Sequence, residues 1–262
     1  MIRDTTTMET LVQVELQDGI GTITMNNPGR MNAFSRAMRD EMIRAFSRLN
    51  DDAACKSIVL TGAGPHFSAG GDLNDFPETT VRECRSRLKR GGALLMREMV
   101  DGPKPVIVAV EGNAYGAGLA LTAAGDHVVA ARGARFCCAF TKVAFMPDLA
   151  VLFNLPRRVG PVKAKQLIAL ADVITGEQAQ QIGLVDELVE DGTALQAAQA
   201  LARRYAGVPP IAFELVKSVF AHGLEDMIRS ETDLQPMAWR SEDHAEGKRA
   251  FFEKRKPVFT GR

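Results

Sequence analysis

The sequence predicts an α/β fold in which short strands alternate with helices, followed by an all-helical C-terminal region. Apolar, strand-like runs recur through the first half of the chain, whereas the pattern after residue 161 is almost entirely helical. The chain has 262 residues, 46% of them hydrophobic, and so can bury a large core. Repeated strand–helix units indicate right-handed crossovers and stacked sheets. We expect a core over residues 1–206 and a helical region over 207–262.

The first strands and the first helix carry clear local signals. Residues 11–16 and 20–25 alternate apolar and polar side chains around Asp18-Gly19, which predicts a hairpin. Ser35 is placed to cap a helix that reaches Leu49. The further elements expected in this half are strands at 57–61, 106–110, 128–130 and 135–137 and helices at 80–99 and from residue 116.

The second half reads as a series of helices broken by one short strand-like segment at 184–189. The expected helices cover residues 162–171, 175–182, 193–206, 210–222 and 224–254.

Composition excludes several classes of function. Basic and acidic residues both number 32, so no charge imbalance points to nucleic acid or a membrane surface as a partner. No apolar run approaches the ~18 residues of a membrane span, and residues 1–10 lack the core of a signal peptide. The cysteines show no metal-ligand spacing, and we expect no metal site. We therefore expect a soluble, cytoplasmic protein.

Two loops of small residues are the most informative stretches. Residues 66–73 read HFSAGGDL and residues 112–118 read GNAYGAG, and each follows an apolar strand and leads toward a helix. Small residues let backbone N–H groups approach a ligand, and a helix N-terminus favours negative charge. Two such loops face to face would form an oxyanion hole. The alternative is that they only connect elements.

These loops and their flanking segments resemble the crotonase family of enoyl-CoA hydratases and isomerases. The resemblance begins at residues 25–34 (MNNPGRMNAF) and continues through both loops and Gly125-Asp126. Further matching segments are residues 155–160, 174–179, 182–185 and 250–259. The order and spacing of these segments, over nearly the whole chain, carry the resemblance.

The resemblance implies a crotonase-like spiral of ββα units with a C-terminal helical region that assembles homotrimers or dimers of trimers. It also implies an acyl-CoA thioester as substrate, with coenzyme A as part of that substrate and no other cofactor. The backbone N–H groups of Gly71 and Ala117 would then hold the thioester oxygen. Since these donors belong to the backbone, the side chain at position 117 is not decisive.

Residues that would contact the substrate also follow from the resemblance. They are Arg30, Met31, Ala33, Ala69, Asp72, Leu73, Phe140, Phe145, Phe251 and Lys254. Core packing is the alternative for the apolar members, and a solvated helix end is the alternative for Lys254.

The acid–base residues indicate which reaction of the family to expect. Hydratases use two glutamates, and the matching positions here hold Ala120 and Phe140, so ordinary hydration is not expected. Asp148 stands where hydratases commonly have glycine, which resembles the enoyl-CoA isomerases that use an aspartate, including the ring-epoxide isomerases of phenylacetate degradation. Asp148 would carry a proton between two carbons of the substrate. We expect the apolar Phe140 and Phe145 to raise its pKa.

Several alternatives stay open at this point. Related enzymes with an aspartate here include 4-chlorobenzoyl-CoA dehalogenase and dihydroxynaphthoyl-CoA synthase. Residual hydration, other lyase or hydrolase chemistry, or acyl-CoA binding without turnover are also compatible with the sequence. Glu78, Glu83 or Glu98 could add a second carboxylate, although a solvated helix face is the simpler interpretation. His66 lies beside the first loop and is more simply structural.

Overall fold

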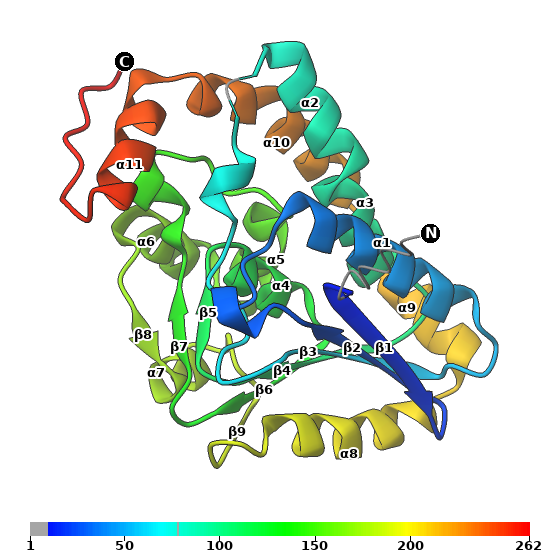
Figure 1. The fold of residues 1–262 in the computed structure, drawn as a ribbon. Helices are drawn as coiled ribbons and strands as arrows, with labels where there is room; N and C mark the ends of the chain where they lie inside the picture. Colours follow the sequence, from blue (N-terminus) through cyan, green and yellow to red (C-terminus); the bar gives the residue numbers. More distant parts are fainter. Residues whose placement is uncertain (1–9, 78) are drawn as a thin grey trace, which may run out of the picture.

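The computed structural model describes residues 10–77 and 79–262, and it confirms the α/β class (Figure 1). The segment 1–9, where we expect no targeting signal, lies outside the described residues. The strands are β1 Val12–Gln17, β2 Ile20–Met25, β3 Ser57–Gly62, β4 Val106–Val110, β5 Asn113–Tyr115, β6 His127–Ala131, β7 Arg135–Cys137, β8 Ile174–Thr175 and β9 Glu187–Val189. The helices are α1 Arg36–Asp51, α2 Val81–Arg90, α3 Gly92–Met96, α4 Ala117–Ala124, α5 Val151–Val159, α6 Pro161–Leu170, α7 Gly176–Gln181, α8 Ala194–Ala206, α9 Pro210–Phe220, α10 Leu224–Trp239 and α11 Glu242–Phe252.

The chain winds through two sheets. The larger sheet has the order β1-β2-β3-β4-β6-β9, and the smaller has the order β5-β7-β8. The predicted hairpin β1–β2 is antiparallel, and every later neighbour in the larger sheet is parallel. Two strands of the larger sheet, β4 and β6, are each followed by a strand of the smaller sheet and then by helices. Because the strands of the larger sheet from β2 onward are parallel, the segments that follow them emerge at the same edge of the sheet.

Helices cover both faces of the larger sheet. On one face α8 packs its alanines and Leu201 against Val59, Ile107 and Val129. On the other face lies a larger apolar core, which includes the fully buried Phe46 and Phe136. Strands buried on both faces explain the almost uninterrupted apolar runs of β3 and β4. None of the described helices is both long and apolar enough to cross a bilayer.

The helix predicted over residues 80–99 is broken in the structure. The α2 helix ends at Arg90, α3 begins at Gly92, and a π-helical turn follows over Arg97–Asp101. Gly91 has the non-helical angles φ −125° and ψ −98°. A Cβ at Gly91 would overlap the guanidinium group of Arg39, so the glycine leaves room for that side chain at the break.

The structure differs from the predicted elements at three further places, all in the second half of the chain. The α5 helix was not predicted, because Pro156 inside it resembles a helix break. The predicted helix 224–254 is two helices, α10 and α11, and the Ser241 side chain caps α11 by accepting the N–H of His244 at 3.0 Å. The two-residue strand β8, antiparallel to β7, was also not foreseen.

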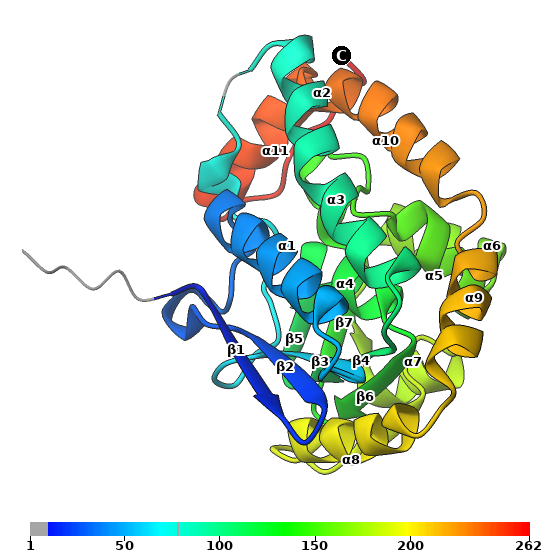
Figure 2. The same cartoon turned by 90° about the vertical axis from the view of Figure 1, so that its right-hand side faces the viewer.

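The two C-terminal helices pack on the core rather than apart from it. The α10 helix runs alongside α2 (Figure 2), and Arg85 of α2 forms an ion pair of 2.6 Å with Asp233 of α10. The indole N–H of Trp239 donates to the carbonyl oxygen of Pro77 at 3.4 Å. The helical tail is thereby placed over the ends of the spiral, where the site lies.

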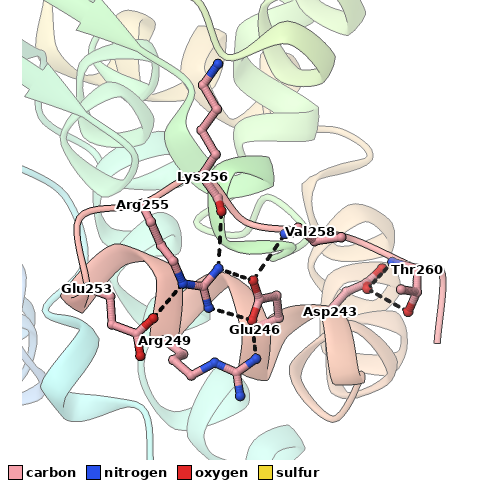
Figure 3. Close-up of polar contacts among 8 residues, drawn as sticks. All are labelled: Asp243, Glu246, Arg249, Glu253, Arg255, Lys256, Val258 and Thr260. Atoms are coloured by element: carbon pink, nitrogen blue, oxygen red, sulfur yellow. Dashed lines mark hydrogen bonds and ion pairs between the residues drawn. The ribbon is translucent and has the colours of Figure 1, made fainter.

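The last ten residues, 253–262, fold back along α11 (Figure 3). The Glu246 carboxylate accepts hydrogen bonds from the Arg255 guanidinium at 2.5 Å and from the N–H of Val258 at 3.1 Å. The Asp243 carboxylate accepts the N–H of Thr260 at 2.6 Å. We call residues 253–262 the C-terminal strap.

Candidate active site

The two small-residue loops lie against each other. Gly70 has φ 101°, and a Cβ at this position would lie 2.9 Å from the carbonyl oxygen of Tyr115. Gly116, which precedes α4, has φ 49° and ψ −111°, a conformation that side chains disfavour. Glycine is therefore required at both points for the loops to touch.

Each loop presents one backbone N–H group without a protein partner. Within residues 10–77 and 79–262, neither Gly71 N–H nor Ala117 N–H donates a hydrogen bond to the protein. The first loop is held by Ser68, whose hydroxyl accepts the N–H of Gly70 at 3.2 Å and donates to the Asn32 carbonyl at 2.8 Å. Ala117 is the first residue of α4, where the helix field favours negative charge. Two free donors can thus stabilise an oxygen that becomes anionic.

Both donors line one cavity of about 220 Å³. The predicted site residues in its wall are Ala69, Gly71, Leu73, Ala117, Phe140, Phe145, Asp148 and Phe251. An aromatic cluster closes another side, with Phe145 ring centroids 5.2 Å from Phe76, 5.4 Å from Trp239 and 5.1 Å from His244. Trp239 and His244 come from α10 and α11, so the helical tail completes the cavity.

The other predicted substrate contacts lie outside the cavity wall. Arg30 and Asp72 form an ion pair of 2.9 Å, and Asp72 also accepts the N–H of Asn74 at 3.1 Å. Met31 is 44% exposed. Ala33 donates its N–H to the Arg30 carbonyl. Lys254 is exposed in the C-terminal strap. The contacts of these five residues with coenzyme A stay predictions.

Asp148 is the carboxyl group that the sequence singled out, and it faces this cavity. It precedes Leu149 and Ala150, which both have positive φ angles of 55° and 52°. Burial raises the pKa of Asp148 to about 7, while the charge of Arg39, another cavity residue, opposes part of this effect. A carboxyl group with such a pKa can both take and return a proton near neutral pH.

A second carboxyl group in the cavity wall, Glu231 of α10, was not predicted. It is 5% exposed, and its Oε2 accepts the N–H of Ala150 at 3.2 Å. Burial, followed by the negative charge of Asp148, raises its pKa to about 8. The sequence carried one signal for this residue, its helical spacing from the apolar positions of α10. Glu231, Thr232 and Gln235 lie on the buried face of that helix.

Of the other acidic candidates, the described Glu83 and Glu98 do not line the cavity. Glu83 is exposed and closes the capping box of α2 with Thr80. Glu98 accepts a hydrogen bond from Asn50 at 2.9 Å, and Glu78 lies outside the described residues. His66 accepts the N–H of Asn113 at 3.3 Å and so joins the two loops.

The positions that match the hydratase glutamates carry no acid. Ala120 is fully buried in α4, and Phe140 is 8% exposed in the cavity wall. Among the described residues no three His, Cys, Asp or Glu side chains cluster so that they could hold a metal ion. The cavity thus presents two free N–H donors and two carboxyl groups with raised pKa values.

Comparison with known proteins relates this chain to enzymes that act on acyl-CoA thioesters. The family model described as enoyl-CoA hydratase/isomerase matches residues 15–262. The chain is 37% identical over 254 residues to 1,2-epoxyphenylacetyl-CoA isomerase of Escherichia coli, covering 94% of this chain and 97% of that protein. It is 32% identical over 251 residues to crotonyl-CoA hydratase of Syntrophomonas wolfei, covering 94% and 96%. The crystal structure of an enoyl-CoA hydratase from Mycobacterium avium subsp. paratuberculosis superposes with a TM-score of 0.84 at 27% identity, covering 95% and 98%.

Proposed function

Because the chain belongs to the enoyl-CoA hydratase/isomerase family, we propose that it is an enoyl-CoA isomerase that moves a double bond through a thioester enolate. The observation that carries the proposal is the placement of Asp148. A carboxyl group with a pKa of about 7 shares a cavity with two free backbone donors. The positions of the hydratase glutamates hold Ala120 and Phe140 instead.

The proposed reaction is a 1,3-proton shift on a 3-enoyl-CoA. The ionised Asp148 removes a proton from the α-carbon, and the electron pair of the broken C–H bond delocalises onto the thioester oxygen. The N–H groups of Gly71 and Ala117 stabilise that oxygen, by roughly 2.7–4 kcal/mol for each donor in comparable sites. The protonated Asp148 then returns the proton to the γ-carbon, which yields the conjugated 2-enoyl thioester. No net proton is gained or lost.

Hydration of a 2-enoyl-CoA is the second candidate. Two observations favour it: crotonyl-CoA hydratase is among the relatives, and Glu231 supplies a second carboxyl group.

The aromatic wall of Phe76, Phe145 and Trp239 suits a cyclic acyl group as well as a straight chain. This is in keeping with a relative that acts on epoxyphenylacetyl-CoA.

The deciding experiment follows one substrate of each kind, a 3-enoyl-CoA and a 2-enoyl-CoA, in deuterated water. We expect the wild type to convert the 3-enoyl-CoA to the 2-enoyl-CoA, with deuterium entering the γ-carbon only to the extent that the proton held by Asp148 exchanges with the solvent. We expect Asp148→Asn to lower this rate by about 10²–10⁴-fold. The affinity of Asp148→Asn for a saturated acyl-CoA should equal that of the wild type, which separates an effect on catalysis from an effect on binding. Formation of 3-hydroxyacyl-CoA without isomerisation would establish the hydratase alternative.

The assembly and location belong to the same proposal. We propose a homotrimer or a dimer of trimers in the cytoplasm, built through the helical region 207–262. The face of α9 supports this, because Ile211, Leu215, Val219 and Phe220 are each at least 61% exposed. Light scattering of the purified protein, coupled to size-exclusion chromatography, measures the subunit number directly.

A further inference from the structure

Glu231 is buried in a way that disfavours its ionised form. Its Oε1 is buried and has no hydrogen-bond partner within the described residues, while its Oε2 has only the N–H of Ala150. A buried carboxylate needs several donors or a cation, whereas a protonated carboxyl group has a much smaller desolvation cost. Glu231 therefore lacks the partners that a permanent negative charge would require.

The charged groups on the neighbouring elements do not supply that partner. Arg85 of α2 is paired with Asp233, and Arg87 donates to the carbonyl oxygen of Asp75 at 2.6 Å. Arg39 of α1 is paired with Asp40 at 2.8 Å.

Groups of α11 and α5, which pack against α10, are engaged elsewhere as well. In α11 the ring of His244 is hydrogen-bonded to the carbonyl oxygen of Val143 at 2.7 Å. In α5 Arg157 donates to the carbonyl oxygen of Phe153 at 2.9 Å. The charged group that acts on Glu231 is Asp148, whose charge is of the same sign.

Two carboxyl groups that share one low-dielectric cavity do not readily ionise together. Asp148 and Glu231 both line the cavity, and the N–H that Glu231 accepts belongs to Ala150, two residues along the chain from Asp148. We propose that Glu231 is the second member of a carboxyl pair and holds a proton while Asp148 is ionised. This inference rests on the proposed isomerisation, since Asp148 must be ionised to take the substrate's proton.

With Glu231 protonated, the two carboxyl groups and the reacting part of the substrate together carry a single negative charge. When Asp148 takes the α-proton, the negative charge passes to the thioester oxygen, and a neutral Glu231 adds no opposing charge beside it. Asp148 later returns the same proton to the γ-carbon, and the Glu231 proton stays in place throughout. Glu231 is thus a positioning residue that sets the protonation state of Asp148, and it does not itself react.

The pH dependence of kcat/KM on a 3-enoyl-CoA tests this role in wild type, Glu231→Gln and the control Glu225→Gln. Glu225 is an exposed carboxylate of the same helix, paired with Arg97 at 2.6 Å. We expect a bell-shaped profile for wild type and for the control, with an alkaline limb that reports ionisation of Glu231. One pH unit above that midpoint, kcat/KM of the wild type should be about tenfold below its maximum. At the same pH, kcat/KM of E231Q should still equal the maximum for that variant. A wild type without an alkaline limb, or the same limb in E231Q, would overturn the proposal.

A second measurement does not depend on the folding of E231Q or on turnover. Carbon-13 NMR of side-chain carboxyl groups should show one glutamate of the wild type titrating well above the usual range. That glutamate should titrate at lower pH in Asp148→Asn, where the neighbouring charge is gone. Glutamates that all titrate in the ordinary acid range would refute the carboxyl pair even if isomerisation is observed. Absence of isomerisation with the coupled titration intact would refute only the proposed reaction.

Discussion

Lys217 and Asp126 form an ion pair of 2.7 Å that ties α9 to the larger sheet. The Lys217 ammonium group also donates to the carbonyl oxygens of Met99 and Lys104, both at 2.9 Å. The Asp126 carboxylate in turn accepts the N–H of Val106 at the start of β4 at 2.8 Å. All three ammonium protons of a side chain that is only 3% exposed therefore have acceptors.

Replacing Lys217 by methionine should destabilise the fold. The substitution keeps the length of the apolar stem but leaves Asp126 and two carbonyl groups without their donor. Because the Asp126 side chain is 24% exposed and retains Val106 as a partner, we expect a loss of about 2–3 kcal/mol, below the usual cost of breaking a fully buried pair. Urea denaturation measures this loss in the free energy of unfolding, and Lys165→Met, at an exposed position, is the control. Equal midpoints for the two variants would contradict the assigned role.

Replacing Gly116 by alanine should impair catalysis more than binding. The φ of 49° and ψ of −111° at Gly116 are unfavourable for alanine, so the backbone must turn and move the N–H of Ala117. We expect kcat to fall by about 10²–10³-fold, the usual cost of one lost oxyanion donor, with little change in acyl-CoA affinity. Gly192→Ala is the matched control, because Gly192 also has a positive φ, 84°, but faces open space. Unchanged kcat in Gly116→Ala would exclude this loop from the oxyanion site.

The carboxyl pair should make the protein less stable as pH rises. The pKa values of Asp148 and Glu231 lie at about 7 and about 8 in the fold, above their ordinary values of 3.8 and 4.5. The folded state thus binds more protons than the unfolded state between about pH 4 and 8, and stability falls as pH rises through this window. Thermal melting across this range should show a smaller decline in Glu231→Gln, and in Asp148→Asn, than in wild type. Parallel curves would show that neither carboxyl group is perturbed.

The C-terminal strap should detach when Glu246 loses its charge. Arg255 and its neighbouring donors hold the pKa of Glu246 below its usual range, so the carboxylate stays ionised through ordinary pH (Figure 3). In Glu246→Gln we expect trypsin to cleave several-fold faster after Lys254 and Arg255, because the strap loses its ion pair. Asp226→Asn, which removes an exposed carboxylate of α10, serves as control. Equal cleavage rates in both variants would show that the ion pair does not hold the strap.

Local signals predicted the parts of the fold whose causes are local. The Ser35 cap is present, with its side chain accepting the N–H of Met38 at 3.2 Å, and the hairpin turns at Asp18-Gly19 as expected. The break at Gly91 was not predicted, and the residue that packs closely against it, Arg39, lies on another helix, far from Gly91 in the sequence. The α5 helix contradicts the local signal of Pro156, since packing of Phe153 and Leu155 in the core outweighs the lost backbone hydrogen bond.

The sequence by itself determined the α/β class, the family and the two loops with Gly71 and Ala117, because strand periodicity and small-residue turns depend on neighbours along the chain. It also pointed to Asp148, through the resemblance of the residues around it. Only the tertiary structure brought Glu231 into the same cavity, since packing of α10 over the spiral buries that side chain against a loop distant in sequence. The raised pKa values follow from the same packing, because desolvation depends on the atoms around a group rather than on its neighbours in the chain.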